Sequence, residues 1–145
     1  LVKLHHNNKP ILIAGTHLDS KGQEVRDKQY QLINDKIITP YKSKEIDFLL
    51  AGDLNTEQKS IAFKKMIKLF ELENSPLKES SPYTYDEDNS WINYDNKGWI
   101  DYILHQLTSQ SKVVNQYIIR PTMLHKNKTI DLADHYGIVL EIVVN

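Results

Sequence analysis

The chain of 145 residues contains no cysteine. This absence excludes disulfide bonds, thiolate metal sites and a cysteine nucleophile. Without cysteines, the redox conditions of the protein's cellular compartment cannot be inferred from the sequence. The chain also lacks any apolar run of about eighteen residues, so the sequence predicts no membrane-spanning segment. It does not begin with methionine, and Leu1–Leu4 resembles the middle of a strand. We therefore expect the natural start to lie upstream, and localisation stays unknown because no targeting segment can be judged.

An excess of charge of either sign is missing as well. The chain has 18 basic and 19 acidic residues, which gives a formal net charge of -1. This balance provides no bulk electrostatic reason to expect binding to nucleic acid or an anionic membrane, although a local basic patch stays open. The hydrophobic share of 40% is slightly below the globular average. The length corresponds to one domain or a piece of one, and we expect residues 1–145 to form a single partial domain.

Short apolar runs bounded by turn residues predict strands along most of the chain. Leu1–His5 and Ile11–Thr16 flank the turn signal Asn7–Pro10, which predicts an antiparallel pair. Further strands are expected at Asp47–Leu54, Tyr83–Tyr85, Trp99–Leu104, Val113–Ile119 and Tyr136–Val144, with an irregular connection over Met123–Ala133.

Two segments show the helical period. Over Gln23–Ile38 apolar residues recur on one face, and Pro40 follows the expected end of the helix. Ser60 is a suitable N-cap for a second helix over Ile61–Phe70. Strands and helices in this order predict an α/β or α+β fold.

The strand within Phe48–Asn55 ends in unusual polar groups. Asp53 and Asn55 are two residues apart, so on a strand both side chains point to the same face, about 7 Å apart along the chain. A carboxylate beside an amide suits a cation or a phosphate-bound water. The alternative is a strand that runs into a turn rich in Asp and Asn.

Three other strands carry polar residues at or near one end. His17 follows the strand at Ile11–Thr16, and Asp134 and His135 immediately precede the last strand. Taken singly, these residues are also typical of turns. Asp101 lies inside an apolar strand, where a buried carboxylate needs a partner. In open α/β sheets, active sites are commonly formed by polar residues at the ends of strands.

Taken together, these motifs resemble the endonuclease/exonuclease/phosphatase superfamily, the DNase I-like fold. The matching motifs are Gly-Thr-His-Leu-Asp at 15–19, Gly-Asp-Leu-Asn at 52–55, Trp-Ile-Asp-Tyr at 99–102 and Ala-Asp-His-Tyr at 133–136. The resemblance extends from about Ile11 to Val144 and keeps the motif order. It implies a β-sandwich flanked by helices, in four layers α/β/β/α, of which only the C-terminal part is present. It also implies Mg²⁺-dependent hydrolysis of phosphate esters.

The resemblance implies a role for each site residue. His135 would be the general base that takes a proton from the attacking water, and Asp101 would orient it. His17 would donate to a phosphate oxygen as charge builds in the transition state. Asp53 would position the water or a metal, and Asn55 would hold the phosphate or the metal.

The expected metal ligands are Asp134, Asp53 and Asn55. Their oxygen atoms suit Mg²⁺, with Mn²⁺ or another divalent cation as alternatives. The family's usual Ser-Asp-His is Ala133-Asp134-His135 here, which removes a hydroxyl but neither chemical group. The family's early Asn and metal-binding Glu have no counterpart, because almost nothing precedes Ile11. We expect the missing N-terminal half of the domain to supply them, and we expect residues 1–145 alone to be nearly inactive.

Two features resemble the sphingomyelinase-like branch. Arg26 and Gln29 follow the His17 motif closely, and Tyr83-Thr84-Tyr85-Asp86 is followed by Asn89. A phospholipid headgroup is therefore the preferred substrate, with nucleic acid and inositol phosphates as alternatives. Trp91 and Tyr94 in a polar loop would suit either a headgroup or a base, unless they pack against the domain. A non-catalytic binding module is the alternative of another class, although such a module has no chemical need for all six polar residues.

Overall fold

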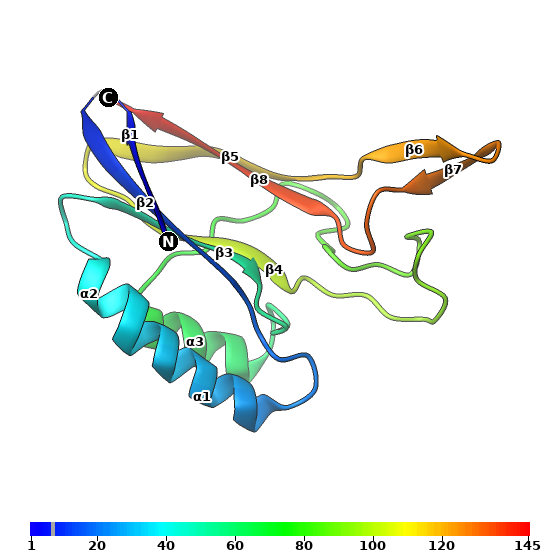
Figure 1. Ribbon diagram of the computed structural model, residues 1–145, viewed down its shortest axis with the longest axis horizontal. Coiled ribbons are helices and arrows are strands. Elements are labelled where there is room, and N and C mark those ends of the chain that lie inside the picture. The colour runs from blue at the N-terminus through cyan, green and yellow to red at the C-terminus, as the bar shows by residue number, and fades with distance from the viewer. Residues whose placement is uncertain (7) are drawn as a thin grey trace.

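The computed structural model describes residues 1–6 and 8–145, and its centre is a four-stranded sheet in the order β1-β2-β3-β4 (Figure 1). Its strands are β1 (Val2–His6), β2 (Lys9–His17), β3 (Asp47–Asp53) and β4 (Asp101–Gln106). β1 pairs with β2 in antiparallel fashion, as predicted. Of the expected turn, Asn7 lies outside the described residues, while Lys9 and Pro10 belong to β2.

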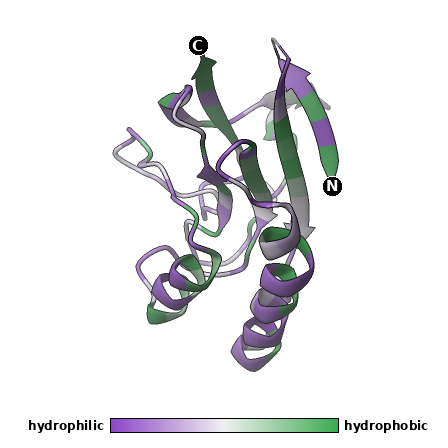
Figure 2. Ribbon diagram, turned by 90° about the vertical axis from the view of Figure 1, so that its left-hand side faces the viewer, coloured by the Kyte–Doolittle hydropathy of each residue, from purple (hydrophilic) through white to green (hydrophobic). Residues whose placement is uncertain are grey.

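β2 and β3 are parallel neighbours, and helices connect them. Both strands are apolar because they are covered from two sides, which is typical of parallel strands joined by a helical crossover. Leu12, Phe48 and Leu50 are almost fully buried in the core beneath this sheet. The helices turn their hydrophilic side outward and leave the hydrophobic strands inside (Figure 2).

The first predicted helix is longer and less regular than expected. It consists of α1 (Gln23–Ile33), the π-helical segment η1 (Asn34–Ile38) and α2 (Thr39–Tyr41). The prediction that Pro40 follows the helix end is wrong, since Pro40 lies within α2. The wider π turn, in which the Thr39 amide donates to the Asn34 carbonyl, accommodates a proline that an ordinary helical interior would not tolerate.

α3 (Ile61–Phe70) matches the predicted bounds. The Ser60 hydroxyl accepts a hydrogen bond from the Phe63 amide at 3.0 Å, which confirms the predicted N-cap. Phe63, Met66 and Phe70 face the core. Glu71, with a φ of 50°, ends the helix in a left-handed conformation.

Two strand predictions need correction at the site end of the sheet. β4 begins at Asp101 rather than at Trp99, so Asp101 is the first residue of the strand and not an interior one. The Trp99 and Ile100 amides donate to side chains instead of to β3: Trp99 to Glu57 Oε2 at 3.1 Å and Ile100 to Thr84 Oγ1 at 3.2 Å. The Ile100 carbonyl still accepts from the Leu54 amide at 2.9 Å. The expected strand at Tyr83–Tyr85 is reduced to a single bridge between Tyr85 and Gly98.

A second sheet and a hairpin complete the described fold. β5 (Ser111–Ile119) pairs with β8 (Gly137–Val144), and β6 (Thr122–His125) pairs with β7 (Lys128–Asp131). The expectation of an irregular connection over Met123–Ala133 is therefore wrong. Lys126 and Asn127, both with positive φ, make a tight hairpin turn without the Asn-Gly or Asp-Gly pair that usually signals one.

The elements are stacked in layers. The helices lie on one side of the four-stranded sheet and β5 and β8 lie on the other, while β6 and β7 project from one end (Figure 1). The mixed α+β class is thus as predicted, and the described residues supply three of the four layers expected of the complete sandwich. No helix within 1–6 and 8–145 has the length and apolarity needed to cross a membrane.

Candidate active site

Sheet register brings three of the predicted site residues into one row. His17 pairs with Asp53 across β2 and β3, and Asp53 pairs with Asp101 across β3 and β4. Each residue lies at the end of its strand, so three distant parts of the chain meet at one edge of the sheet. The spacing of the motifs along the sequence does not reveal this register.

Gly52 makes the close approach of β2 and β3 possible just before Asp53. Its φ is 142°, and a Cβ atom at this position would lie 1.8 Å from the Thr16 carbonyl oxygen. Only glycine avoids this collision with the backbone and tolerates the conformation. The glycine of the 52–55 motif is therefore a steric requirement for bringing His17 alongside Asp53.

Asp53 and Asn55 form a compact polar turn. The Asn55 amide donates to Asp53 Oδ1 at 2.7 Å, and the Asn55 side-chain nitrogen donates to Asp53 Oδ2 at 3.1 Å and to the Leu18 carbonyl at 2.8 Å. Asn55 has a φ of 45°, a left-handed conformation that asparagine tolerates better than most residues. The turn rich in Asp and Asn that the sequence offered as an alternative is therefore present, and its side chains lie at the edge of the sheet next to His17.

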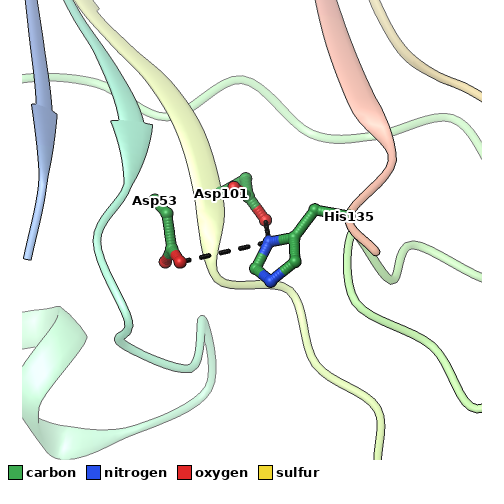
Figure 3. Close-up of side chains that lie close together, drawn as sticks. All are labelled: Asp53, Asp101 and His135. Carbon is green, nitrogen blue, oxygen red and sulfur yellow. Dashed lines mark hydrogen bonds and ion pairs between the residues drawn. The ribbon is translucent and has the colours of Figure 1, made fainter. Parts of the chain in front are cut away.

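Asp101 and His135 form a hydrogen-bonded pair (Figure 3). Nδ1 of His135 lies 2.9 Å from Asp101 Oδ2, and the two side chains are 26% and 19% exposed. The hydrogen bond to Asp101 raises the pKa of His135 above its ordinary value, against the opposing effect of burial. A carboxylate bonded to Nδ1 holds the proton there and leaves Nε2 free to act as an acceptor.

Asp53 lies between two histidines. Its Oδ2 is 3.3 Å from His17 Nε2 and 4.0 Å from His135 Nδ1. Burial raises the pKa of Asp53, and the Asn55 amide and the nearby Asp101 carboxylate act on it in opposite directions. The side chain of His17 is 72% exposed, so its imidazole can meet a ligand from solvent.

These residues open into a cavity of about 870 Å³. His17, Asp53, Asn55 and His135 line it, and so does Asp134, whose side chain is exposed. Tyr85, Trp91 and Tyr94 form an aromatic part of the wall. Trp91 and Tyr94 remain 57% and 59% exposed, so they do not pack into the domain interior. The structure therefore gathers all the predicted residues except Asp101 along the cavity, with Asp101 directly behind His135.

Sequence reasoning did not identify several of the residues that line the cavity as site residues. They are Ser20, Gln23, Glu57, Ser60, Asn96 and Lys97. These residues are common polar types in loops or at helix starts, and no motif spacing marks them. Arg26 also lines the cavity, where it donates to the Asp19 carbonyl at 2.8 Å, and the sequence marked it only through its resemblance to the sphingomyelinase-like branch.

The donor atoms partly fit a divalent cation. One ligand atom from each of Asp53, Asp101 and His135 lies within 4.8 Å of the others. Of the two carboxylates predicted as ligands, Asp53 belongs to this group and Asp134 does not. Carboxylates at close quarters favour a hard cation such as Mg²⁺. The Asp101–His135 hydrogen bond already accounts for the approach of two members, so the oxygen atoms of Asp53 are the better candidates within this group.

Comparisons with known proteins identify the fold. No model of a protein family matches the sequence, and no curated protein matches it at a significant level. Solved structures do match. The Staphylococcus aureus beta toxin superposes with a TM-score of 0.76 and 19% identity, over 99% of this chain and 55% of the toxin. Another structure of this toxin contains bound magnesium ions.

Two further structures are similar to this chain. Sphingomyelinase C from Streptomyces griseocarneus gives a TM-score of 0.71 at 19% identity, over 97% of this chain and 55% of the enzyme. An endonuclease/exonuclease/phosphatase family protein from Bacteroides thetaiotaomicron gives 0.69 at 17% identity, over 92% and 50%. At these identities the similarity establishes the fold, which is the predicted DNase I-like one. The chain spans about half the length of each solved structure.

Proposed function

We propose that this chain is the C-terminal part of a metal-dependent phosphoesterase of the endonuclease/exonuclease/phosphatase family, and that its substrate is a phosphodiester. The observation that carries the proposal is the Asp101–His135 hydrogen bond of 2.9 Å beside Asp53, at the wall of a cavity. A histidine that has its proton held at Nδ1 by a carboxylate is a general base at Nε2. The fold alone would not carry this proposal, because one fold hosts many functions.

In the proposed reaction, Nε2 of His135 takes a proton from water as the water oxygen attacks phosphorus. Asp101 accepts the Nδ1 hydrogen bond and stabilises the imidazolium that forms. The bond between phosphorus and the leaving oxygen then breaks, that oxygen takes a proton from solvent water, and the His135 imidazolium returns its proton to solvent. Asp101 raises the pKa of His135, and this makes the ring a stronger base. The ring must be neutral before the reaction, because only an unprotonated Nε2 can accept the proton.

The neighbouring polar groups would bind and orient the phosphate. His17 is exposed at the cavity and would donate to a non-bridging phosphate oxygen. Asp53, held by two hydrogen bonds from Asn55, would accept a hydrogen bond from the attacking water or hold a cation. Fixed donors and acceptors of this kind stabilise developing charge without reorganising during the reaction.

Mg²⁺ is the preferred cation, and Mn²⁺ or another divalent ion is an alternative. Asp53, Asn55 and Asp134 would hold it through oxygen atoms, as predicted, and when bound it would stabilise negative charge on the phosphate. The pKa of Asp53, raised by burial, is consistent with a carboxylate that benefits from a nearby positive charge. The principal metal-binding Glu would come from the N-terminal half.

A phospholipid headgroup is the preferred substrate, as in a sphingomyelinase-like phospholipase. The aromatic wall of Tyr85, Trp91 and Tyr94 supports it, since such a surface suits a headgroup beside the phosphate. A base can also stack on these rings, so a nuclease is the runner-up, and an inositol-phosphate phosphatase is a third candidate. A non-catalytic binding module would need neither the Asp101–His135 pair nor the ordered Asp53.

In the test, the full-length protein is incubated separately with sphingomyelin and with plasmid DNA in the presence of Mg²⁺. We expect release of choline phosphate that is lost with a chelator and falls by about 10²–10⁴ in His135→Ala. His125→Ala is the matched control, because His125 is exposed in the β6–β7 hairpin. Full activity in His135→Ala would overturn the mechanism, and DNA cleavage without choline-phosphate release would overturn the lipid substrate.

The reading frame upstream of Leu1 separates an enzyme from a binding module. We expect a Glu shortly after a strand in that region, and a non-acidic residue there would favour the binding module. Residues 1–145 as an isolated chain should be nearly inactive. Hydrolysis by that isolated chain, dependent on Mg²⁺ and abolished by His135→Ala, would refute the need for an N-terminal half.

A further inference from the structure

Two polar residues next to the Asp101–His135 pair are almost completely buried. Thr84 is 0% exposed and Asn89 is 1% exposed. Neither residue has a place in the proposed reaction, and both belong to the segment that follows Pro82. A buried hydroxyl and a buried amide are costly unless their hydrogen bonds are made, so their contacts indicate what they do.

Thr84 contacts both chain segments that carry the pair. Its Oγ1 accepts from the Ile100 amide at 3.2 Å and from the Asp101 amide at 3.1 Å. Its carbonyl accepts a hydrogen bond at 2.7 Å from the amide of Tyr136, the residue that follows His135. A single buried residue thus joins the backbone of Asp101 to the backbone beside His135.

Asn89 holds the other side of the histidine segment. Its side-chain nitrogen donates to the Ala133 carbonyl at 2.9 Å, two residues before His135. Its side-chain oxygen accepts from the Trp91 amide at 3.0 Å, and its own amide donates to the Asp86 carbonyl at 3.0 Å. The Asn89 carbonyl accepts from the Ile92 amide at 2.9 Å, so all four polar groups of Asn89 are engaged. The backbone is therefore fixed both before and after His135.

This support is needed because regular structure does not join the two residues. Asp101 begins β4 in the four-stranded sheet, whereas His135 precedes β8 in the second sheet. Residues 132–136 lie outside any helix or strand. No sheet ladder sets the distance between the two side chains, although their 2.9 Å hydrogen bond requires a narrow range of positions.

We propose that Thr84 and Asn89 are positioning residues that hold Asp101 and His135 at hydrogen-bonding distance. Thr84 acts through the backbone of both partners, and Asn89 acts through Ala133. Neither is a catalytic residue, because neither touches the reacting atoms in the proposed reaction. The inference rests on the proposed function only for its effect on rate; the geometric part concerns the chain itself.

The first variant is Thr84→Val, which keeps the shape of the side chain and removes the acceptor for the Ile100 and Asp101 amides. Thr84→Ser is its matched control, because it keeps the hydroxyl oxygen. The readout is the tautomer of His135 in long-range ¹H–¹⁵N spectra of the full-length protein, at a pH where the ring is neutral. We expect the Nδ1–H form, enforced by Asp101, in the unmodified chain and in Thr84→Ser.

In Thr84→Val we expect His135 to shift toward the Nε2–H form that a free imidazole prefers. Asn89→Ala provides an independent second variant, and the same shift is expected there. Met66→Ala controls for general loss of stability, since Met66 is buried in α3 and is not hydrogen-bonded to either segment. Retention of the Nδ1–H form in Thr84→Val or in Asn89→Ala overturns the proposal for that residue. If Thr84→Val does not fold, Asn89→Ala and Thr84→Ser decide it: the proposal fails if Asn89→Ala keeps the Nδ1–H form or Thr84→Ser loses it.

A rate measurement on the protein as its gene encodes it completes the test. We expect kcat to fall about 10²-fold in Thr84→Val with little change in KM, and Thr84→Ser to restore it. If His135→Ala keeps full activity, the proposed function fails while the tautomer result stands. If the tautomer is unchanged while His135→Ala is inactive, the positioning role fails and the proposed function stands.

Discussion

Among single residues, the pKa values of two histidines are shifted in opposite directions by their surroundings. His105 is 3% exposed, and burial lowers its pKa, while Nε2 lies 2.9 Å from the Ser75 hydroxyl. His135 has a raised pKa because of its hydrogen bond to Asp101. The difference between them is the presence of a carboxylate partner, which distinguishes a packed histidine from a candidate base.

This difference predicts opposite effects on the pH dependence of stability. A lowered pKa in the folded state means that His105 contributes stability above its ordinary pKa of 6.5, and that this contribution is lost as the pH falls below that value. A raised pKa means that His135 contributes stability below 6.5, which is lost as the pH rises through the folded value.

We therefore expect His105→Gln to lose less stability than the unmodified chain between about pH 7 and pH 5, and His135→Gln to lose more. The measurement is the free energy of unfolding in urea at each pH. Parallel curves for His105→Gln and the unmodified chain would contradict the assignment of a buried, neutral His105.

Gly52 gives a second prediction at this scale. Gly52→Ala places a Cβ against the Thr16 carbonyl in a conformation that side chains rarely adopt, and we expect a loss of about 3 kcal/mol or more. Gly15→Ala is the matched control on the neighbouring strand, because a Cβ there meets nothing within 4 Å. Thermal unfolding measures both. Equal melting temperatures for the two variants would show that the β2–β3 approach is less constrained than the structure indicates.

At the scale of elements, α3 agrees best with its sequence. Its N-cap, its apolar face and its end at residue 70 all follow from local signals. Ser60, which caps the start of this helix, also lines the cavity. The stability of this helix start can therefore be tested separately from the chemistry of the site.

We expect Ser60→Ala to lower the free energy of unfolding by about 1 kcal/mol, because the Phe63 amide loses its acceptor. Ser60→Asp should retain most of the stability, since aspartate is also a favourable N-cap. Chemical denaturation of the three chains provides the measurement. A loss in Ser60→Asp as large as in Ser60→Ala would mean that the hydroxyl matters for a reason other than capping.

At the scale of the whole molecule, the described sheets have open edges. Within 1–6 and 8–145, β1 pairs only with β2, and its Val2 and Leu4 are 55% and 48% exposed. β5 and β8 pair only with each other among the described residues, and Val143 is 41% exposed. Unpaired edges with exposed apolar side chains promote association between chains. They are consistent with a fold in which further chain covers these surfaces.

We expect the isolated chain 1–145 to self-associate at micromolar concentration and Leu4→Lys to reduce this association, because a lysine on an edge strand opposes strand pairing. Val25→Lys is the control, since Val25 is 47% exposed but lies on α1. Analytical ultracentrifugation measures the mass. A chain that remains monomeric without the substitution would contradict the prediction.

The amino-acid sequence alone predicted the fold and most of the local structure. Six polar residues in four ordered motifs indicated a phosphoesterase-like site and the DNase I-like fold, and the apolar runs located β2, β3, β5, β8 and α3. These signals are local: a strand or cap depends mainly on residues close in sequence. Predictions from local signals were wrong where the backbone adopts an uncommon conformation. Pro40 lies within α2 after a π-helical turn, and the Lys126–Asn127 hairpin turn forms without glycine.

How these residues come together depends on the tertiary structure. The row of His17, Asp53 and Asp101 depends on strand register, and the contact between Asp101 and His135 joins two different sheets. The roles of Thr84 and Asn89 depend on buried hydrogen bonds to segments up to 52 residues away (Tyr136 − Thr84). Register and long-range hydrogen bonds are set by packing among distant segments, which no short stretch of sequence encodes.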